Sequence, residues 1–194
     1  MIELCANWRL HSCCYLAWAI HPEWGKNALR VKRELRSVIT TIAEYEPVKL
    51  LVASDRVDDA RQQSFGANVE IIEAPVDDIW MRDIIPTFGR RGKEVVAIDW
   101  NCNGWGSTRE RPARPGDKLA RYISIGDDRI CAPFVAEGGA FITDSKGTII
   151  TTRSCLLNEN RNVGKTEIEI EEGFASLGGR QVILARGESG RTHH

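Results

Sequence analysis

Three carboxylates and a tryptophan lie close together in the stretch APVDDIWMRDIIPTF. Asp77, Asp78 and Asp83 stand around Trp80 and Arg82, and the stretch then becomes apolar. A solvated acidic loop does not need a tryptophan, and a core strand does not favour carboxylates. The pattern therefore favours a ligand that is cationic and that also has a flat or apolar part.

A further carboxylate, Glu137, precedes the glycine pair Gly138 and Gly139, and two glycines allow a ligand to approach the backbone closely. A guanidinium group is planar, always charged and carries five N–H donors in a fixed fork. It is bound best by carboxylates and by an aromatic face along its alkyl stem. Asp83, Glu137 and Trp80 supply these parts, so the residue types predict a guanidinium site.

Two other uses of the same side chains stay open at this level. An acidic loop with a half-buried tryptophan needs no ligand at all. The four carboxylates could instead hold a hard cation through oxygen. Against the metal, no EF-hand spacing is present, and His11 and His21 lie far away in the sequence.

The bulk composition is that of an ordinary soluble globular protein. The 194 residues are 42% hydrophobic and 27% charged, enough for one domain with a sizeable core or for part of a larger one. A formal net charge of −1 with scattered Lys and Arg argues against a nucleic-acid partner. No apolar run approaches membrane-spanning length, and the start MIELCANWRL lacks the pattern of a secretory signal. We expect a cytoplasmic protein without a membrane partner; a homo-oligomer is compatible with the sequence.

The six cysteines do not form a recognisable framework. They are Cys5, Cys13, Cys14, Cys102, Cys131 and Cys155. No C-x-x-C pair occurs, which argues against a zinc ribbon, and a chain of this size does not need disulfide staples. The sequence predicts reduced and mostly buried thiols.

Short alternating elements must position these residues. Strands are expected at residues 13–20, 48–53, 69–72, 94–100 and 181–185. Helices are expected at residues 26–46, 58–64 and 166–179, and a helix end at 119–125. In the first helix the apolar residues at helical spacing, which should pack on the strands, are Leu35, Val38, Ile39 and Ile42.

Two further elements carry the candidate site residues. A strand is expected directly after Asp83, and the apolar runs on both sides of DSKG predict a hairpin within residues 137–152. Strands and helices alternate along the whole chain without a linker. This order indicates an α/β fold.

Three separated motifs resemble one enzyme family. DDIWMRDIIPTF, DWNCNGWG and EGGAFITDSKGTIITTRSCLLNENRN are similar to the agmatine deiminase and bacterial-type peptidylarginine deiminase family, within the guanidino-group-modifying pentein superfamily. YLAWAIHPEWG and AEYEPVKLLV match the N-terminal region of that family. The likeness covers nearly the whole chain, in order.

The resemblance implies a fold and a chemistry. The fold is a propeller of ββαβ-like units around a central funnel, here partial and truncated before closure, so that residues 1–194 form a single incomplete domain. In the family a cysteine thiolate attacks the guanidinium carbon, a histidine protonates the departing ammonia, and water hydrolyses the thiouronium intermediate. No cofactor and no metal are needed.

The resemblance also assigns roles to residues of this chain. Asp83 would hold the guanidinium nitrogens, Trp80 would pack on the alkyl chain, and Glu137 would bind the guanidinium and support the histidine. Asp77 and Trp105 are further substrate-binding candidates.

Two catalytic motifs of the family are missing from the sequence. Its histidine sits in Gly-His-x-Asp, and its nucleophilic cysteine lies in a glycine-rich stretch near the end of a chain nearly twice as long. GRTHH places His193 or His194 near the expected histidine, but without the aspartate, and two terminal histidines are equally a tail. No cysteine here replaces the nucleophile, so the sequence resembles the N-terminal half of a deiminase.

Three functions follow as hypotheses. The first is agmatine deimination to N-carbamoylputrescine and ammonia, on the route to putrescine. The second is deimination of an arginine side chain in a peptide. The third is a non-catalytic module that still binds guanidinium. We expect no turnover by this chain alone.

Overall fold

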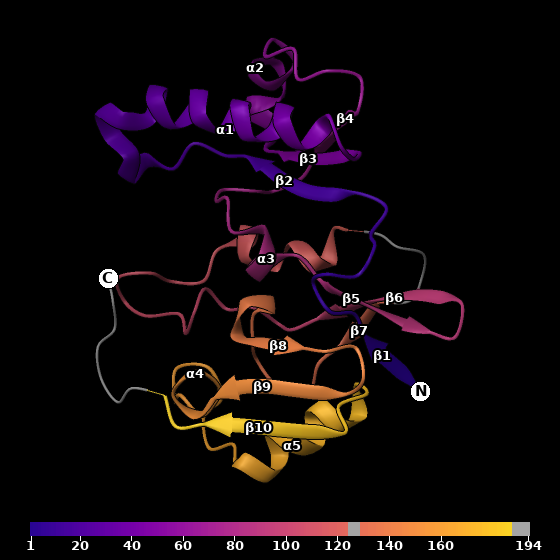
Figure 1. Cartoon of the computed structure of the whole chain (residues 1–194). Helices are drawn as coiled ribbons and strands as arrows, with labels where there is room; N and C mark the ends of the chain where they lie inside the picture. Colours follow the sequence, from indigo (N-terminus) through magenta and orange to yellow (C-terminus); the bar gives the residue numbers. More distant parts are fainter. Residues whose placement is uncertain (124–128, 188–194) are drawn as a thin grey trace. The chain divides into compact units, whose positions relative to one another are not determined.

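The chain folds into two compact units of short strands and helices, seen in a computed structural model that describes residues 1–123 and 129–187 (Figure 1). Leu10–Met81 form the first, here called the parallel-sheet unit. Met1–Arg9 and Arg82–His194 form the second, the two-sheet unit. The mixture of strands and helices agrees with the α/β prediction.

The parallel-sheet unit is a three-stranded sheet with helical crossovers. Its elements are β2 (Cys14–Trp18), η1 (Pro22–Asn27), α1 (Ala28–Ala43), β3 (Val48–Val52), η2 (Ser54–Arg56), α2 (Val57–Arg61) and β4 (Val69–Glu73). The strands are parallel in the order β2-β3-β4, which requires a crossover between each pair. In Figure 1, α1 lies along this sheet.

The apolar face of α1 confirms three of the four predicted contacts. Leu35, Ile39 and Ile42 pack in the core of this unit, and Ile39 is fully buried. Val38 was predicted there wrongly, because its side chain is 49% exposed. The buried stripe of α1 also includes Ala43. At about 100° per residue, the centre of this stripe lies roughly 85° around the helix axis from Val38.

The two-sheet unit contains the EGG and DWNCNGWG motifs. The strands of its first sheet, in the order β1-β5-β6-β7, are β1 (Ile2–Leu4), β5 (Thr87–Arg91), β6 (Glu94–Asp99) and β7 (Arg129–Cys131). The strands of the second, in the order β10-β9-β8, are β8 (Phe141–Thr143), β9 (Thr148–Thr152) and β10 (Gln181–Ala185). Its helices are α3 (Met81–Ile84), η3 (Pro115–Arg121), η4 (Gly138–Ala140), α4 (Arg153–Leu156) and α5 (Glu167–Ser176).

Several predicted elements of this unit are confirmed. β8 and β9 form the antiparallel hairpin around DSKG, and β10 runs parallel to β9. The predicted helix at 166–179 is α5, which begins after Thr166. The Thr166 side chain accepts a hydrogen bond from the Glu169 N–H, and the Glu169 carboxylate accepts one from the Thr166 N–H, a capping box.

Other elements differ from the predictions. The strand expected directly after Asp83 begins only at Thr87, because residues up to Ile84 form the helical turn α3 and Pro86 precedes the strand. The helix end expected at 119–125 is the 3-10 helix η3, which starts earlier, and residues 124–128 lie outside the described residues. The short elements β1, β7 and α4 were not predicted.

A cluster of aromatic side chains anchors the start of the DWNCNGWG segment. Trp100 is almost fully buried and packs against Phe134, Phe141 and Phe174, with ring centroids 5.7, 4.7 and 5.7 Å away. Its indole N–H donates to the Thr87 hydroxyl over 2.8 Å. Trp100 directly follows β6, so the chain that leaves this strand toward DWNCNGWG starts from a rigid point.

Candidate guanidinium-binding site

The Arg82–Asp83 segment and the EGG motif are joined by hydrogen bonds in both directions. The Gly139 N–H donates to Asp83 Oδ1 over 3.0 Å. Arg82 reaches the same segment, because its Nε donates to the Gly138 carbonyl over 2.8 Å and its Nη2 to the Phe141 carbonyl over 3.3 Å. The Arg82–Asp83 segment and the EGG motif, which are far apart in the sequence, therefore form one structural feature.

The two glycines of EGG are required by this contact. A Cβ on Gly138 would lie 2.3 Å from the Arg82 carbonyl oxygen, and one on Gly139 would lie 2.2 Å from Asp83 Oδ1. Both distances are far below van der Waals contact. The close approach found here is made by the Arg82–Asp83 segment; close approach by a ligand stays a prediction.

We expect alanine at these two glycines to have different effects. Gly138→Ala meets backbone and is expected to lower the free energy of unfolding by about 1–3 kcal/mol. Gly139→Ala meets the end of a side chain that can rotate, so it costs less stability but displaces the Asp83 carboxylate. Agmatine affinity is therefore expected to fall about tenfold or more in Gly139→Ala, a loss of about 1.4 kcal/mol. Thermal unfolding and calorimetric titration of both variants check this; equal stability losses with unchanged affinity in Gly139→Ala would contradict it.

Glu137 is buried and paired with an arginine of the chain. Its side chain is 2% exposed, and Arg161 Nε donates to Glu137 Oε1 over 3.0 Å. Arg161 Nη1 also donates to the Cys155 carbonyl over 3.3 Å. Burial raises the pKa of Glu137, the Arg161 charge lowers it, and the Asp83 charge raises it further. The two carboxylates are thus near enough to interact electrostatically.

Asp83 has the same electrostatic character. Burial raises its pKa, although the Gly139 N–H, a hydrogen bond from the Trp105 side chain and the charges of Arg82 and Arg161 all lower it. Two carboxylates in a partly dry environment are best stabilised by a further cation that donates hydrogen bonds. This arrangement suits a guanidinium group.

Trp105 lies beside Asp83 but already has a partner on its ring. The Arg111 guanidinium stacks over the ring, 4.8 Å from the centroid, and is held by the Asp117 carboxylate over 2.5 and 2.6 Å. Trp105 adopts a φ of 59°, next to Gly104 at 73°. A hydrogen bond from the Trp105 side chain lowers the pKa of Asp83, so Trp105 is oriented toward this carboxylate.

The remaining predicted site residues belong to the other unit or fall outside the described residues. Asp77 and Trp80 belong to the parallel-sheet unit, where Trp80 is 55% exposed and Asp77 is half-buried. His193 and His194 lie outside the described residues. Over residues 1–123 and 129–187, no group of three or more His, Cys, Asp or Glu side chains is arranged to hold a metal ion.

The cysteines are free thiols in varied surroundings. The prediction that they are mostly buried was wrong: Cys102 is buried, Cys131 is exposed and the other four are half-buried. Burial raises the pKa of Cys102 to about 12, with the Glu137, Asp117 and Asp83 charges adding to it. Burial also raises the pKa of Cys155. Neither thiol is activated as a nucleophile, because the thiolate is the reactive form.

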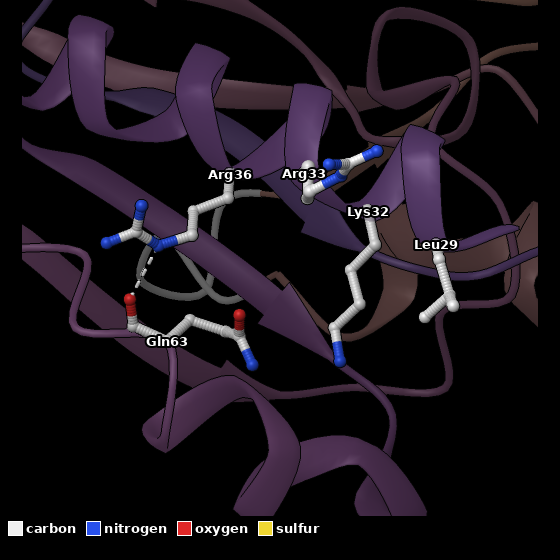
Figure 2. Close-up of a pocket in the computed structure, with 5 residues that line it drawn as sticks. All are labelled: Leu29, Lys32, Arg33, Arg36 and Gln63. Carbon is white, nitrogen blue, oxygen red and sulfur yellow. Dashed lines mark hydrogen bonds between the residues drawn. The ribbon is translucent and has the colours of Figure 1, made fainter.

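A pocket in the parallel-sheet unit is lined by basic side chains, in contrast to the carboxylates of the candidate site. Figure 2 shows its lining residues, which are Leu29, Lys32, Arg33, Arg36 and Gln63. Arg36 Nε donates to the Gln63 carbonyl over 2.8 Å, the dashed line in Figure 2. Three basic side chains would repel a cationic ligand, so this pocket does not suit a guanidinium group.

The chain belongs to the Porphyromonas-type peptidyl-arginine deiminase family, whose model matches residues 3–193. A Legionella pneumophila (strain Paris) protein, provisionally named an agmatine deiminase, is 37% identical over 183 residues, which are 92% of this chain and 53% of the relative. The agmatine deiminase of Ectopseudomonas mendocina (strain ymp) is 35% identical over 176 residues, 86% of this chain and 47% of the relative.

A solved structure extends the likeness to the fold. The agmatine deiminase of Enterococcus faecalis superposes with a TM-score of 0.85 at 26% identity, over 94% of this chain and 52% of that one. The mixed α/β fold therefore matches agmatine deiminase structures. The chain spans about half the length of the relatives it matches.

Sequence reasoning missed Arg161 and Asn162. They belong to LLNENRN, part of the third motif that carries the family resemblance, and no site residue was predicted within LLNENRN. Asn162 is buried; its Oδ1 accepts from the Val135 N–H, and its Nδ2 donates to the Val135 and Leu156 carbonyls, each over 2.8 Å. An arginine and asparagines directly after two leucines were the available signal, because buried polar side chains need specific partners.

Proposed function

We propose that this chain contributes the guanidinium-binding carboxylates of an agmatine deiminase-type hydrolase. The observation that carries the proposal is the hydrogen bond between EGG and Asp83, which links a half-buried carboxylate to the motif of the buried Glu137. The family relationship supports a C–N hydrolase acting on a guanidino compound. The reaction would convert agmatine and water to N-carbamoylputrescine and ammonia, a step on the route to putrescine.

The residues of this chain would bind and orient the substrate. The Asp83 and Glu137 carboxylates accept the guanidinium N–H groups and fix the plane of the cation, so that its carbon faces an attacking group. Trp80 would pack on the alkyl stem, as the resemblance of WMRD implies. In the mechanism that the resemblance implies, a cysteine thiolate attacks, a histidine protonates the ammonia, and water hydrolyses the thiouronium intermediate. We propose no cofactor.

The chemical steps would need residues that the 194 amino acids lack. Gly-His-x-Asp and a cysteine in a glycine-rich stretch do not occur in the sequence. We therefore propose that residues 1–194 are a single incomplete domain, part of a propeller, which binds the substrate without turning it over. The peptidylarginine alternative uses the same two carboxylates, and a guanidinium-binding module without catalysis is the third reading.

The cellular location and the partners of the protein are also proposals. No helix among the described residues is long and apolar enough to cross a membrane. We propose a cytoplasmic location and a small guanidino substrate, without a nucleic-acid partner.

Calorimetric titration with three ligands tests the proposal. Agmatine should bind measurably, 1,5-diaminopentane at least about tenfold more weakly because it lacks the guanidinium fork, and an Nα-acyl-arginine amide more weakly than agmatine. Tighter binding of the arginine amide would favour the peptide substrate. Equal binding of agmatine and the diamine would contradict a guanidinium site.

A further inference from the structure

We propose that Arg161 is a positioning residue of the guanidinium site, which fixes the Glu137 carboxylate and keeps it negatively charged. The inference rests on the proposed function for the identity of the ligand. It assigns a part in binding to a residue that lies outside the predicted carboxylate and tryptophan set.

The Arg161 guanidinium is held by hydrogen bonds to two groups. Its side chain is 12% exposed, Nε contacts Glu137 Oε1 over 3.0 Å, and Nη1 contacts the Cys155 carbonyl over 3.3 Å. The two contacts restrain the guanidinium from two sides. A restrained arginine restrains the carboxylate that it binds, because the fork of N–H donors is rigid.

The neighbouring residue holds the backbone that leads to Glu137. The Asn162 side-chain amide pairs with both the N–H and the carbonyl of Val135 over 2.8 Å. Arg161 and Asn162 thus secure the side chain of Glu137 and the main chain two residues before it. This double attachment distinguishes the pair from an incidental surface contact.

The same loop also reaches the segment that carries Trp105. The Asn103 side chain donates to the Asn160 carbonyl over 3.1 Å. A Cβ on Gly106 would lie 3.0 Å from the Asn160 Cβ, so these segments pack closely. Because Trp105 hydrogen-bonds Asp83, the loop that carries Arg161 supports both carboxylates.

The charge around Glu137 explains why a cation is needed there. The groups that interact with it electrostatically include Arg161, Asp83, Cys102 and Cys155. Burial and the neighbouring carboxylate both favour the protonated form of Glu137. Arg161 opposes them. A protonated Glu137 would lose its charge-assisted attraction for a guanidinium.

The test measures the titration of Glu137 directly. The chain is labelled with ¹³C at glutamate carboxyls, Glu137→Gln assigns the signal, and wild type is compared with Arg161→Gln. We expect the titration midpoint of the Glu137 carboxyl to move to higher pH in Arg161→Gln. We also expect the agmatine dissociation constant of this variant to rise about tenfold or more at pH 7, and to return toward the wild-type value as pH increases. Arg153→Gln is the matched control, since Arg153 pairs with Glu167 at an exposed site, and should change neither quantity.

Two further outcomes decide the inference. An unchanged midpoint in a folded Arg161→Gln variant would overturn it, because a merely structural arginine would alter thermal stability alone. If that variant does not fold, Arg161→Lys replaces it, because lysine keeps the positive charge. This variant is expected to keep the Glu137 midpoint but to bind agmatine several-fold more weakly. Wild-type agmatine affinity in Arg161→Lys would overturn the positioning role of Arg161. Should agmatine not bind wild type, the proposed function fails, but the Glu137 midpoint still tests Arg161.

Discussion

Incubation of the purified chain with agmatine is expected to release no ammonia or ureido product above the buffer background. The 194 residues contain no Gly-His-x-Asp motif. Cys102, in the DWNCNGWG motif, is a buried thiol. Burial and nearby carboxylates raise its pKa to about 12, so it stays protonated at neutral pH. Loss of one member of a cooperating catalytic group costs several orders of magnitude in rate. The assay uses agmatine at high concentration with ammonia and ureido detection.

The variants that interpret this assay are cysteine and histidine replacements. Cys102→Ser and Cys155→Ser, together with replacement of His193 and His194, should leave the background unchanged. Turnover that survives loss of both histidines but disappears on changing one cysteine would contradict the account. It would identify a thiol of this chain as the nucleophile.

Asp83→Asn is expected to weaken agmatine binding about 100-fold or more at pH 7. The variant removes the charge of a half-buried carboxylate that the bound guanidinium would cover, and truncating one partner of such a covered charge pair typically costs about 2–5 kcal/mol. Stability should not fall in parallel. Because the folded-state pKa of Asp83 is raised by burial, ionisation of this acid disfavours the folded state above that pKa, and the cost disappears as pH falls through it. Calorimetry and thermal unfolding of the same samples separate the two effects.

A matched control and a pH series sharpen this prediction. Asp144 also accepts backbone N–H groups, from Lys146 and Thr148, but lies in the turn between β8 and β9. Asp144→Asn should leave agmatine affinity unchanged. Wild-type affinity should decline as pH falls, at a higher pH than ordinary carboxylates require, because burial raises the pKa of both site carboxylates. Wild-type affinity in Asp83→Asn, or an equal loss in the control, would contradict the assignment.

The sequence predicted well where local pattern and burial agree. The regular apolar segments gave β3, β6 and β10 within one or two residues, and turn chemistry gave the β8–β9 hairpin. The short elements were harder, since three-residue strands such as β7 depend on a partner elsewhere in the chain. Val38 failed because periodicity gives the width of an apolar stripe but not its centre.

The candidate site was predictable in its carboxylates and not in what holds them. Asp83 and Glu137 followed from residue type and from the family resemblance. Arg161 did not, because an arginine in a polar run has no local signal for a buried partner more than twenty positions away. The glycines of EGG were predicted to let a ligand approach the backbone; the structure shows them packed against the Arg82–Asp83 segment. Tertiary contacts of this kind are not encoded in spacing.

A crystal structure of the chain with agmatine bound would test the guanidinium site most directly. We predict that the guanidinium nitrogens lie about 2.7–2.9 Å from carboxylate oxygens of both Asp83 and Glu137, with Arg161 still on Glu137. An ordered agmatine that contacts neither carboxylate would contradict the central claim.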